Sequence, residues 1–438
     1  MNRISRFAIY KIGDSRFMTE WAWTRIGWRN IGRHRKRSAL TMLGLGGSFI
    51  AVVVLVGWVD GLMIEITNSA TGFTNGSIEI NAAEFRPDRR VYDTIGGRDG
   101  TDVEHLLEQL TADPSVLAVT PRVYGGGLVS RGDGETTVGA MLIGVDPDRE
   151  RSVTNFLDGG VEGRLPEPGQ NEVLLGGEMA RQLEVGVGDQ VIMVAPGADG
   201  SLGNDLYAVA GIFRTGVPQF EAANVVLPVI DLQTLITLDP GRIHQIMVAI
   251  DDPVRPDAVA TRLADVLASE PSALEAVPWT VLRPEIVEIS ALVSSVYGVI
   301  IALVFGIAMF GVANTMLMST YERRREIAVM LALGSTPRSI VKTILYEAVG
   351  LGFLSLVFGV LVSVPLVAWW SSSPVDLSWL YPNITFQGAI MPPVWRVEFN
   401  SAVWVQASVA LFVTALLAAL YPAVRAVRVP PADTLSGL

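Results

Sequence analysis

Four long stretches of this chain contain no charged residue, and they constrain its fold more than any other feature. They cover residues 38–59, 289–321, 348–375 and 399–424, which are 22, 33, 28 and 26 residues long. An α-helix needs about 20 mostly apolar residues to cross the hydrocarbon core of a bilayer. Each stretch is therefore long enough to span a membrane once, and we predict an α-helical membrane protein with four transmembrane helices.

The overall composition agrees with this class of protein. Half of the 438 residues are hydrophobic and only 18% are charged, whereas about 25% are charged in an average soluble domain. The first stretch exceeds the roughly 7–15 apolar residues of a signal peptide, so we expect an uncleaved anchor. The chain has no cysteine, which excludes disulfides, cysteine-ligated zinc and a cysteine nucleophile.

Basic residues gather on one side of the four predicted spans. They are Arg25, Arg29, Arg33, Arg35, Lys36 and Arg37 before the first span, Arg323, Arg324, Arg325, Arg338 and Lys342 between the second and third, and Arg425 and Arg428 after the fourth. The positive-inside rule then places both termini in the cytoplasm. Segment 61–285, with 34 acidic and 15 basic residues, lies on the other side.

These features divide the chain into nine segments. They are a cytoplasmic basic segment (1–37), transmembrane helix 1 (38–60), a periplasmic α+β domain with a stalk (61–285), transmembrane helix 2 (286–321), a cytoplasmic coupling segment (322–342), transmembrane helix 3 (343–375), a short periplasmic loop (376–398), transmembrane helix 4 (399–424) and a cytoplasmic tail (425–438).

The first two spans are longer than a bilayer requires. A helix of 33 residues reaches about 50 Å, against about 30 Å of hydrocarbon. The first helical pattern continues past Asp60 without a turn signal until Thr71 and Gly72. We predict that both helices extend beyond the membrane as a stalk; strong tilting of the helices is the alternative.

Small residues recur at intervals of four in two spans. Span two has Ser294, Gly298, Ala302 and Gly306, and span three has Ser355, Gly359 and Ser363. Such rows let helices approach closely, either within one chain or between two chains. The four uncharged stretches also lack the buried charges that usually mark an ion pathway, which argues against a channel.

The large segment between spans one and two is predicted to be mixed α+β. Strand patterns cover 76–81, 117–129, 136–145, 171–175, 188–194, 206–215, 224–228 and 245–250, and helical patterns cover 103–110, 177–183 and 258–269. Gly125, Gly126 and Gly127 suggest a flexible loop, and the Arg-Gly-Asp triplet at 131–133 is explained by a hairpin turn. We find no nucleophile–base pair and no metal-ligand spacing.

The segment between spans two and three carries the most specific pattern. Its sequence over 322–337 is Glu-Arg-Arg-Arg-Glu-Ile-Ala-Val-Met-Leu-Ala-Leu-Gly-Ser-Thr-Pro. The apolar part, 327–333, predicts a helix that ends at Gly334. Thr336 is a suitable N-cap for the next helix, with Pro337 at its first position. We expect a bent amphipathic element near the bilayer, either for docking or as an ordinary interfacial helix.

This segment resembles the signature of FtsX-like ABC permeases, a group that includes the lipoprotein-releasing (Lol) permeases and the macrolide-exporter type. The residues Trp28, Arg29, Asn30 and Ile31 with the arginines that follow, and the order of spans and insert, are similar too. Ile-Gly-Val-Asp-Pro (143–147), segment 173–189 and segment 209–217 resemble the lipoprotein-releasing type most. The resemblance covers nearly the whole chain.

The resemblance implies a division of labour between chains. Two copies of an ABC ATPase, which carries ATP and Mg²⁺, would dock on this chain through Glu322, Arg323, Arg324, Arg325, Glu326, Met330, Leu333, Gly334, Thr336 and Pro337. The chain lacks a phosphate-binding Gly-x-x-x-x-Gly-Lys motif, so it would be a non-catalytic permease subunit without a cofactor of its own. A second permease, as homodimer or heterodimer, would complete the bacterial inner-membrane complex.

The same resemblance implies mechanotransmission, in which ATPase closure moves the periplasmic domains. Lipoprotein cargo would then be extracted from the inner membrane, contacting apolar positions such as Val52, Val56, Val59 and Val296, and passed to a periplasmic lipoprotein carrier. The turn at 215–221, with Pro218, is one possible carrier-binding loop. Membrane lipids are further partners, and nucleic acid is not expected.

Three other functions stay open at this stage. A related permease could export another amphipathic molecule or a peptide. A regulator of cell-wall hydrolases would use the same stroke, although about 225 external residues exceed what that branch generally carries. A membrane-anchored receptor or adhesion module would leave segment 322–340 without a role.

Overall fold

The computed structural model forms two compact units. It describes residues 35–86, 90–97, 100–132, 134, 136–157, 160–377, 379–380, 384–386, 389–391 and 394–428. The helical unit comprises the described parts of Met1–Gly61, Ala291–Val375 and Trp395–Leu438, and the sheet unit comprises those of Leu62–Ser290 and Asp376–Val394. Most of the predicted basic segment 1–37, with Arg25, Arg29 and Arg33, lies outside the described residues.

Four long helices match the four predicted spans. They are α2 (Arg35–Ala70), α10 (Pro284–Glu322), α12 (Pro337–Ser372) and α13 (Ser401–Val427). In the described part of the chain these four are long and apolar enough to cross a membrane. Helix α2 continues to Ala70 and passes into a single π-helical turn, η1 (Thr71–Asn75), where the sequence predicted its end. The four spans are therefore confirmed.

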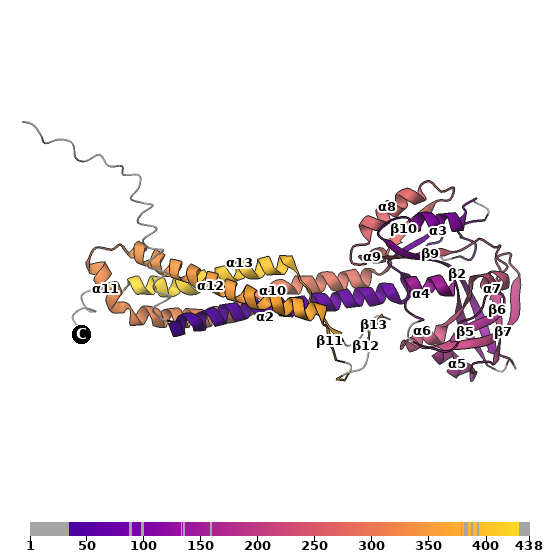
Figure 1. The fold of residues 1–438 in the computed structure, drawn as a ribbon, viewed down its shortest axis with the longest axis horizontal. Helices are drawn as coiled ribbons and strands as arrows, with labels where there is room; N and C mark the ends of the chain where they lie inside the picture. Colours follow the sequence, from indigo (N-terminus) through magenta and orange to yellow (C-terminus); the bar gives the residue numbers. More distant parts are fainter. Residues whose placement is uncertain are drawn as a thin grey trace, which may run out of the picture. The chain divides into compact units, whose positions relative to one another are not determined.

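Within the helical unit the four helices run beside one another (Figure 1) and share one apolar core. Helix α12 packs mainly on α13 and approaches α2 closely at the small-residue row of span three. A Cβ atom added to Gly359 would lie 2.8 Å from Cδ1 of Phe49, and Ser355 and Ser363 are buried beside it. This row therefore packs within the chain.

A polar cluster ties three helices together at one end of this unit. The Tyr297 hydroxyl donates to Asp60 Oδ1 (2.5 Å), and Asn400 Nδ2 donates to Asp60 Oδ2 (2.7 Å). Asn400 also caps α13 by accepting a hydrogen bond from the backbone nitrogen of Val403. Asp60 lies in α2, Tyr297 lies in α10, and Asn400 is the N-cap of α13. These hydrogen bonds therefore hold the three helices in register along their axes.

The sheet unit is built on one ten-stranded sheet in the order β10-β1-β9-β2-β3-β8-β5-β7-β4, with β6 joined to β2 and β7. The strands are β1 (Ile78–Ala82), β2 (Val116–Arg131), β3 (Thr137–Val145), β4 (Val161–Gly163), β5 (Glu172–Gly176), β6 (Gln190–Pro196), β7 (Leu202–Phe213), β8 (Asn224–Pro228), β9 (Gln245–Ile250) and β10 (Leu274–Pro278). Two strand pairs are parallel, β3 with β8 and β5 with β7. Both kinds of pairing in one sheet confirm the mixed α+β class.

Short helices connect the strands of this sheet. They are α3 (Val103–Thr111), α4 (Pro147–Val153), α5 (Gly177–Leu183), α6 (Pro218–Ala223), α7 (Val229–Leu235), α8 (Asp257–Leu267) and α9 (Trp279–Leu282). The helices predicted at 103–110, 177–183 and 258–269 are confirmed within a few residues. The prediction missed helices α4, α6, α7 and α9 and strands β4 and β10, because the few residues of each carry too weak a periodicity.

The glycine run is the clearest error of the sequence prediction in this unit. The strand predicted at 117–129 is confirmed as β2, but the flexible loop predicted within it is wrong, since Gly125, Gly126 and Gly127 lie inside β2 and pair with β3. A Cβ atom on Gly127 would lie 2.7 Å from the backbone oxygen of Val194 in β6. The missing side chain lets a second strand approach closely, which is a common reason for glycine within a strand.

The predicted loop 376–398 contains two small sheets among its described residues. Strand β11 (Val375–Asp376) pairs with β14 (Val394–Trp395), and β12 (Ile384–Phe386) pairs with β13 (Ala389–Met391). Asp133 of the predicted hairpin turn and tail residues 429–438 lie outside the described part of the chain.

Candidate functional site

The candidate site is the segment that joins α10 to α12. It contains one short helix, α11 (Arg324–Ala332), where the sequence predicted a helix over 327–333. Gly334 follows with a φ of +92°, a left-handed conformation that favours glycine at a helix C-terminus. The side chain of Thr336 then accepts a hydrogen bond from the backbone nitrogen of Ser339, and Pro337 begins α12. Local sequence alone therefore explains the sharp bend.

Two residues predicted to dock a partner form ion pairs within the chain. Glu322 accepts from Arg37 at 2.5 Å, which links the end of α10 to the start of α2. Arg323 lies 3.0 Å from a carboxylate oxygen of Glu347 in α12, and its side chain also approaches Glu326 at 3.5 Å. The side chains of Arg323 and Glu347 are only 13% and 10% exposed, so this pair anchors the segment.

The inner side of α11 packs on the helical unit. Ile327 and Ala328 are buried, and α11 contacts α13. Met330 is half-buried, which makes it a support for the helix more than a free contact. This apolar contact holds α11 against α13, while the two ion pairs connect the residues just before α11 to α2 and α12.

The outer side of α11 carries a row of exposed residues, one basic and two apolar. Arg325, Val329 and Leu333 follow one another at intervals of four residues, which places them on one side of a helix. All three are exposed, and Leu333 reaches 82%. We call these three residues the docking face. Val329 was not singled out from the sequence, although its spacing from Leu333 would have revealed it.

Arg324, Glu326, Gly334, Thr336 and Pro337 complete the predicted set and are all exposed. Glu326 is within reach of Arg323, whereas Thr336 and Pro337 shape the bend. Of the ten predicted docking residues, the structure thus separates an anchoring group from an accessible group. The accessible group is the part of the segment that a partner protein can reach.

The small-residue row of α10 has a different environment from that of α12. Ser294, Gly298 and Ala302 are exposed and Gly306 is half-buried. A Cβ atom on Gly298 or Gly306 would meet nothing within 4 Å among the described residues. No helix of the described chain packs against this row, so the row is available to another chain.

The four residues predicted to contact cargo divide in the same way. Val52 and Val56 are fully buried in the core of the helical unit, and Val59 is half-buried against it. Val296 is 43% exposed. Apolar side chains suit both a helix core and a lipid-facing surface, so the sequence did not separate them. In this structure the accessible position is Val296.

Two of the buried polar arrangements in the sheet unit involve Arg122 and His244. Arg122 and Glu150 form an ion pair with both side chains buried, and Thr154 donates to the same carboxylate at 2.5 Å. His244 Nδ1 accepts from the backbone nitrogen of Tyr124 (3.0 Å), while Nε2 donates to the carbonyl oxygen of Val91 (3.2 Å). Burial lowers the pKa of His244 to about 4, so this imidazole is neutral near pH 7.

The turn at 215–221 is stabilised by hydrogen bonds to the side chain of Glu221, its last residue. Glu221 is buried, and its Oε1 accepts from the backbone nitrogens of Thr215 (2.6 Å) and Gly216 (2.9 Å). Pro218 is exposed at the start of α6.

Among the described residues no group of three His, Asp or Glu side chains is arranged to hold a metal ion.

Comparison with known families fits this architecture. Residues 38–266 match the MacB-like periplasmic core domain, and residues 298–431 match the FtsX-like permease C-terminal model. The first match covers more than half of the chain. A spanning helical unit with such a periplasmic domain defines a permease of the ABC transporter class. The chain belongs to the family of FtsX-like permeases with a MacB-like periplasmic core domain.

Individual relatives cover most of the chain. The lipoprotein-releasing system transmembrane protein LolC of Neisseria meningitidis is 24% identical, over 94% of this chain and 98% of that protein. LolE of Haemophilus influenzae is 24% identical over 76% and 80%. The macrolide export protein MacB of Hahella chejuensis is 25% identical over 94% of this chain and 59% of its own length.

Among solved structures, the periplasmic region of MacB from Actinobacillus actinomycetemcomitans is similar. It is 17% identical, has a TM-score of 0.35, and covers 51% of this chain and 97% of that one.

Proposed function

We propose that this chain is the permease subunit of an ATP-driven complex that extracts lipoproteins from the bacterial inner membrane for delivery to the outer membrane. The observation that carries the proposal is the docking face on α11, a helix anchored to the spanning helices but exposed on its outer side. The match to LolC over nearly its full length supports lipoproteins as the cargo.

The partners follow from this assignment. Two ATPase subunits bind ATP and Mg²⁺ and dock on α11, while this chain itself catalyses no reaction. A second permease packs against the exposed small-residue row of α10, and a periplasmic carrier receives the cargo. Cargo contacts would begin at exposed apolar positions of α10 such as Val296.

Mechanotransmission is consistent with how α11 is held. Arg37 with Glu322, and Arg323 with Glu347, connect the segment to α2, α10 and α12. A displacement of α11 would therefore shift these helices together. Helices α2 and α10 contain 36 and 39 residues, so each extends, uninterrupted, further than the roughly 20 residues that a bilayer needs.

The proposed orientation has both termini in the cytoplasm. Arg37, Arg324 and Arg425 lie at the same end of the helical unit, since Arg37 contacts Glu322 and Arg425 lies over Tyr321. Cytoplasmic ends of spanning helices are enriched in arginine and lysine. This end would face the ATPase.

Leu333→Asp tests the docking step in the full-length chain purified with its ATPase. A charge on the most exposed apolar residue of the docking face should lower ATPase recovery about tenfold or more, as expected for a central interface residue. Leu202→Asp in β7 is the matched control, because Leu202 is also exposed, at 70%. Equal ATPase recovery from both variants would refute the docking face.

The cargo is tested by depletion of the chain in its own host. Lipoproteins should then accumulate in the inner membrane. Normal lipoprotein sorting together with intact ATPase docking would favour the second candidate, export of another amphipathic molecule, which the similarity to macrolide export proteins supports.

A further inference from the structure

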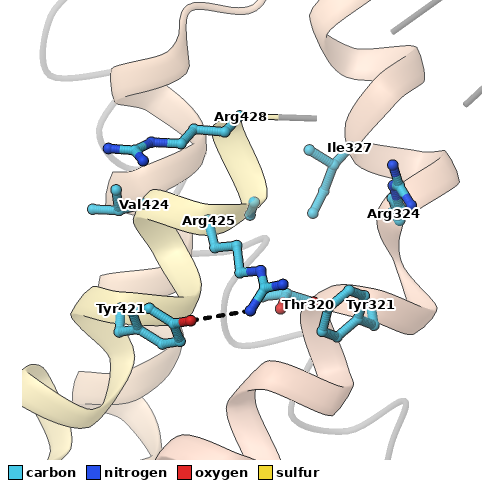
Figure 2. A pocket seen from close by; sticks show the side chains of 9 residues that line it. Thr320, Tyr321, Arg324, Ile327, Tyr421, Val424, Arg425 and Arg428 are labelled. Carbon is cyan, nitrogen blue, oxygen red and sulfur yellow. Dashed lines mark hydrogen bonds between the residues drawn. The ribbon is translucent and has the colours of Figure 1, made fainter. Parts of the chain in front are cut away.

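A cavity of about 550 Å³ lies where α10, α11 and α13 meet. Its volume falls within the range of about 300–1,000 Å³ that is usual for ligand pockets. In Figure 2, Arg425 extends from α13 towards Tyr321, and Ile327 projects from α11 on the opposite side. The guanidinium of Arg428 points away from these residues, so Arg425 is the central cation of the cavity.

The cavity has a marked excess of positive charge. Arg324, Arg425 and Arg428 contribute to its lining, and no described lining residue is acidic. Arg425 Nη1 donates to the Tyr421 hydroxyl (3.0 Å), and its guanidinium lies 5.4 Å from the ring centre of Tyr321. These contacts position the guanidinium, and neither of the two groups carries a negative charge. No carboxylate of the described residues forms an ion pair with these three arginines.

This arrangement contrasts with the other arginines at the same end of the helical unit. Arg37 is paired with Glu322, and Arg323 is paired with Glu347. Among the residues that the structure describes, carboxylates pair with these anchoring arginines and none pairs with those of the cavity. A mobile anion is the natural complement.

The depth of the cavity indicates which anion it holds. The uncharged stretches of α10 and α13 end at Tyr321 and Val424, and both residues line the cavity. It therefore lies where the hydrocarbon core gives way to the head-group layer, a level that favours tyrosine and arginine. Apolar side chains of Ile327 and Val424 line the same cavity and suit the glycerol and upper acyl carbons of a lipid.

We propose that this cavity binds the head group of an anionic phospholipid such as phosphatidylglycerol. The phosphate contacts the guanidinium of Arg425, with Arg324 on the facing helix, and the acyl chains follow the apolar surfaces of α10 and α13. Basic pockets between spanning helices are suited to such head groups. The lipid would join the docking helix α11 to α10 and α13.

The test is native mass spectrometry of the full-length chain released from micelles that contain either dioleoylphosphatidylglycerol or dioleoylphosphatidylcholine. The wild-type chain should retain one phosphatidylglycerol in preference to phosphatidylcholine. Arg425→Gln should lower that occupancy about fivefold, equivalent to about 1 kcal/mol. Arg425→Lys should retain most of it, because an ammonium group also binds phosphate. Arg338→Gln, exposed and outside the cavity, is the matched control and should behave as wild type.

Arg324→Gln provides a second variant if Arg425→Gln does not fold, and it should lower occupancy in the same direction. Equal retention of both lipids, or equal loss in the Arg425→Gln and Arg338→Gln variants, would overturn the proposal. Displacement of the lipid by millimolar inorganic phosphate would identify a free-anion site, and displacement by the ATPase subunit an extension of the docking surface; either result also overturns it. The comparison of the two lipids and of the variants needs neither ATPase nor cargo, so its outcome is independent of the proposed transport function.

Discussion

Gly46→Ala adds one methyl group where α2 and α12 approach most closely. The new Cβ would lie 2.7 Å from Cδ1 of Phe358 and 2.9 Å from the backbone oxygen of Ser355. The phenyl ring has some freedom to turn, but the backbone oxygen moves only with its helix. The two helices must therefore separate slightly, which loosens the surrounding packing.

The size of the effect follows from two opposing contributions. Overpacking a filled core costs about 1–3 kcal/mol, whereas alanine is favoured over glycine inside a helix by about 1 kcal/mol. The net change in the free energy of unfolding should thus lie between zero and a loss of about 2 kcal/mol. Gly44→Ala is the matched control in the same helix, because its Cβ would meet nothing within 4 Å. The difference between the two variants, about 1–3 kcal/mol, isolates the overpacking cost.

Thermal unfolding of the full-length chain in detergent measures this difference. Its ten tryptophans provide the fluorescence signal. The chain has no cysteine for thiol-reactive dyes. Gly46→Ala should unfold several degrees below Gly44→Ala. Equal unfolding temperatures, or a higher one for Gly46→Ala, would refute the argument that close helix contact requires glycine here.

Three further predictions concern the sheet unit, the anchor and the second permease. The pKa of His244 is about 4 in the fold, against 6.5 unperturbed. As the pH falls, the unfolded chain therefore takes up this proton before the folded chain does. The free energy of unfolding should decline by up to about 3 kcal/mol between pH 6.5 and pH 4. The unfolding temperature of His244→Asn should therefore fall less steeply across that window than the wild type's, and parallel curves would contradict this. Arg323→Ala removes the ion-pair partner of Glu347 and should lower the free energy of unfolding, measured by thermal unfolding, by about 1.5–3 kcal/mol. Arg325→Ala should cause no measurable loss. Equal losses in the two variants would show that the Arg323–Glu347 ion pair does not stabilise the segment. Ala302→Leu should leave the unfolding temperature of the single chain unchanged but weaken association with the second permease in size-exclusion chromatography with light scattering, and unimpaired association would place the contact elsewhere.

The bend of the coupling segment is a feature that local sequence predicts correctly. Gly334 and Thr336 predicted a helix end followed by a new N-cap, and both act in these roles. Such signals depend on backbone conformation and on hydrogen bonds between residues close in sequence. For the same reason the predicted boundaries of α3 and α5 agree with the structure.

The glycine run of β2 shows where local sequence fails. Three successive glycines have no preference of their own for a strand. Their extended conformation is imposed by pairing with β3, and the approach of β6 to Gly127 then excludes a side chain. Both partners come from other parts of the chain, so the run by itself suggested a loop.

By itself the sequence determined the number and length of the spans, the mixed class of the inserted domain and the caps of the coupling segment. These follow from composition, length and neighbouring residues. Only the tertiary structure decided which faces of the spans are used: Gly359 is covered, Gly298 is open, and Val52 is buried while Val296 is not. A helix core and a lipid-facing surface are both apolar, so no hydrophobic pattern distinguishes them. In the same way, only the fold placed the carboxylate of Glu347 beside Arg323 and, among the described residues, no carboxylate beside Arg425.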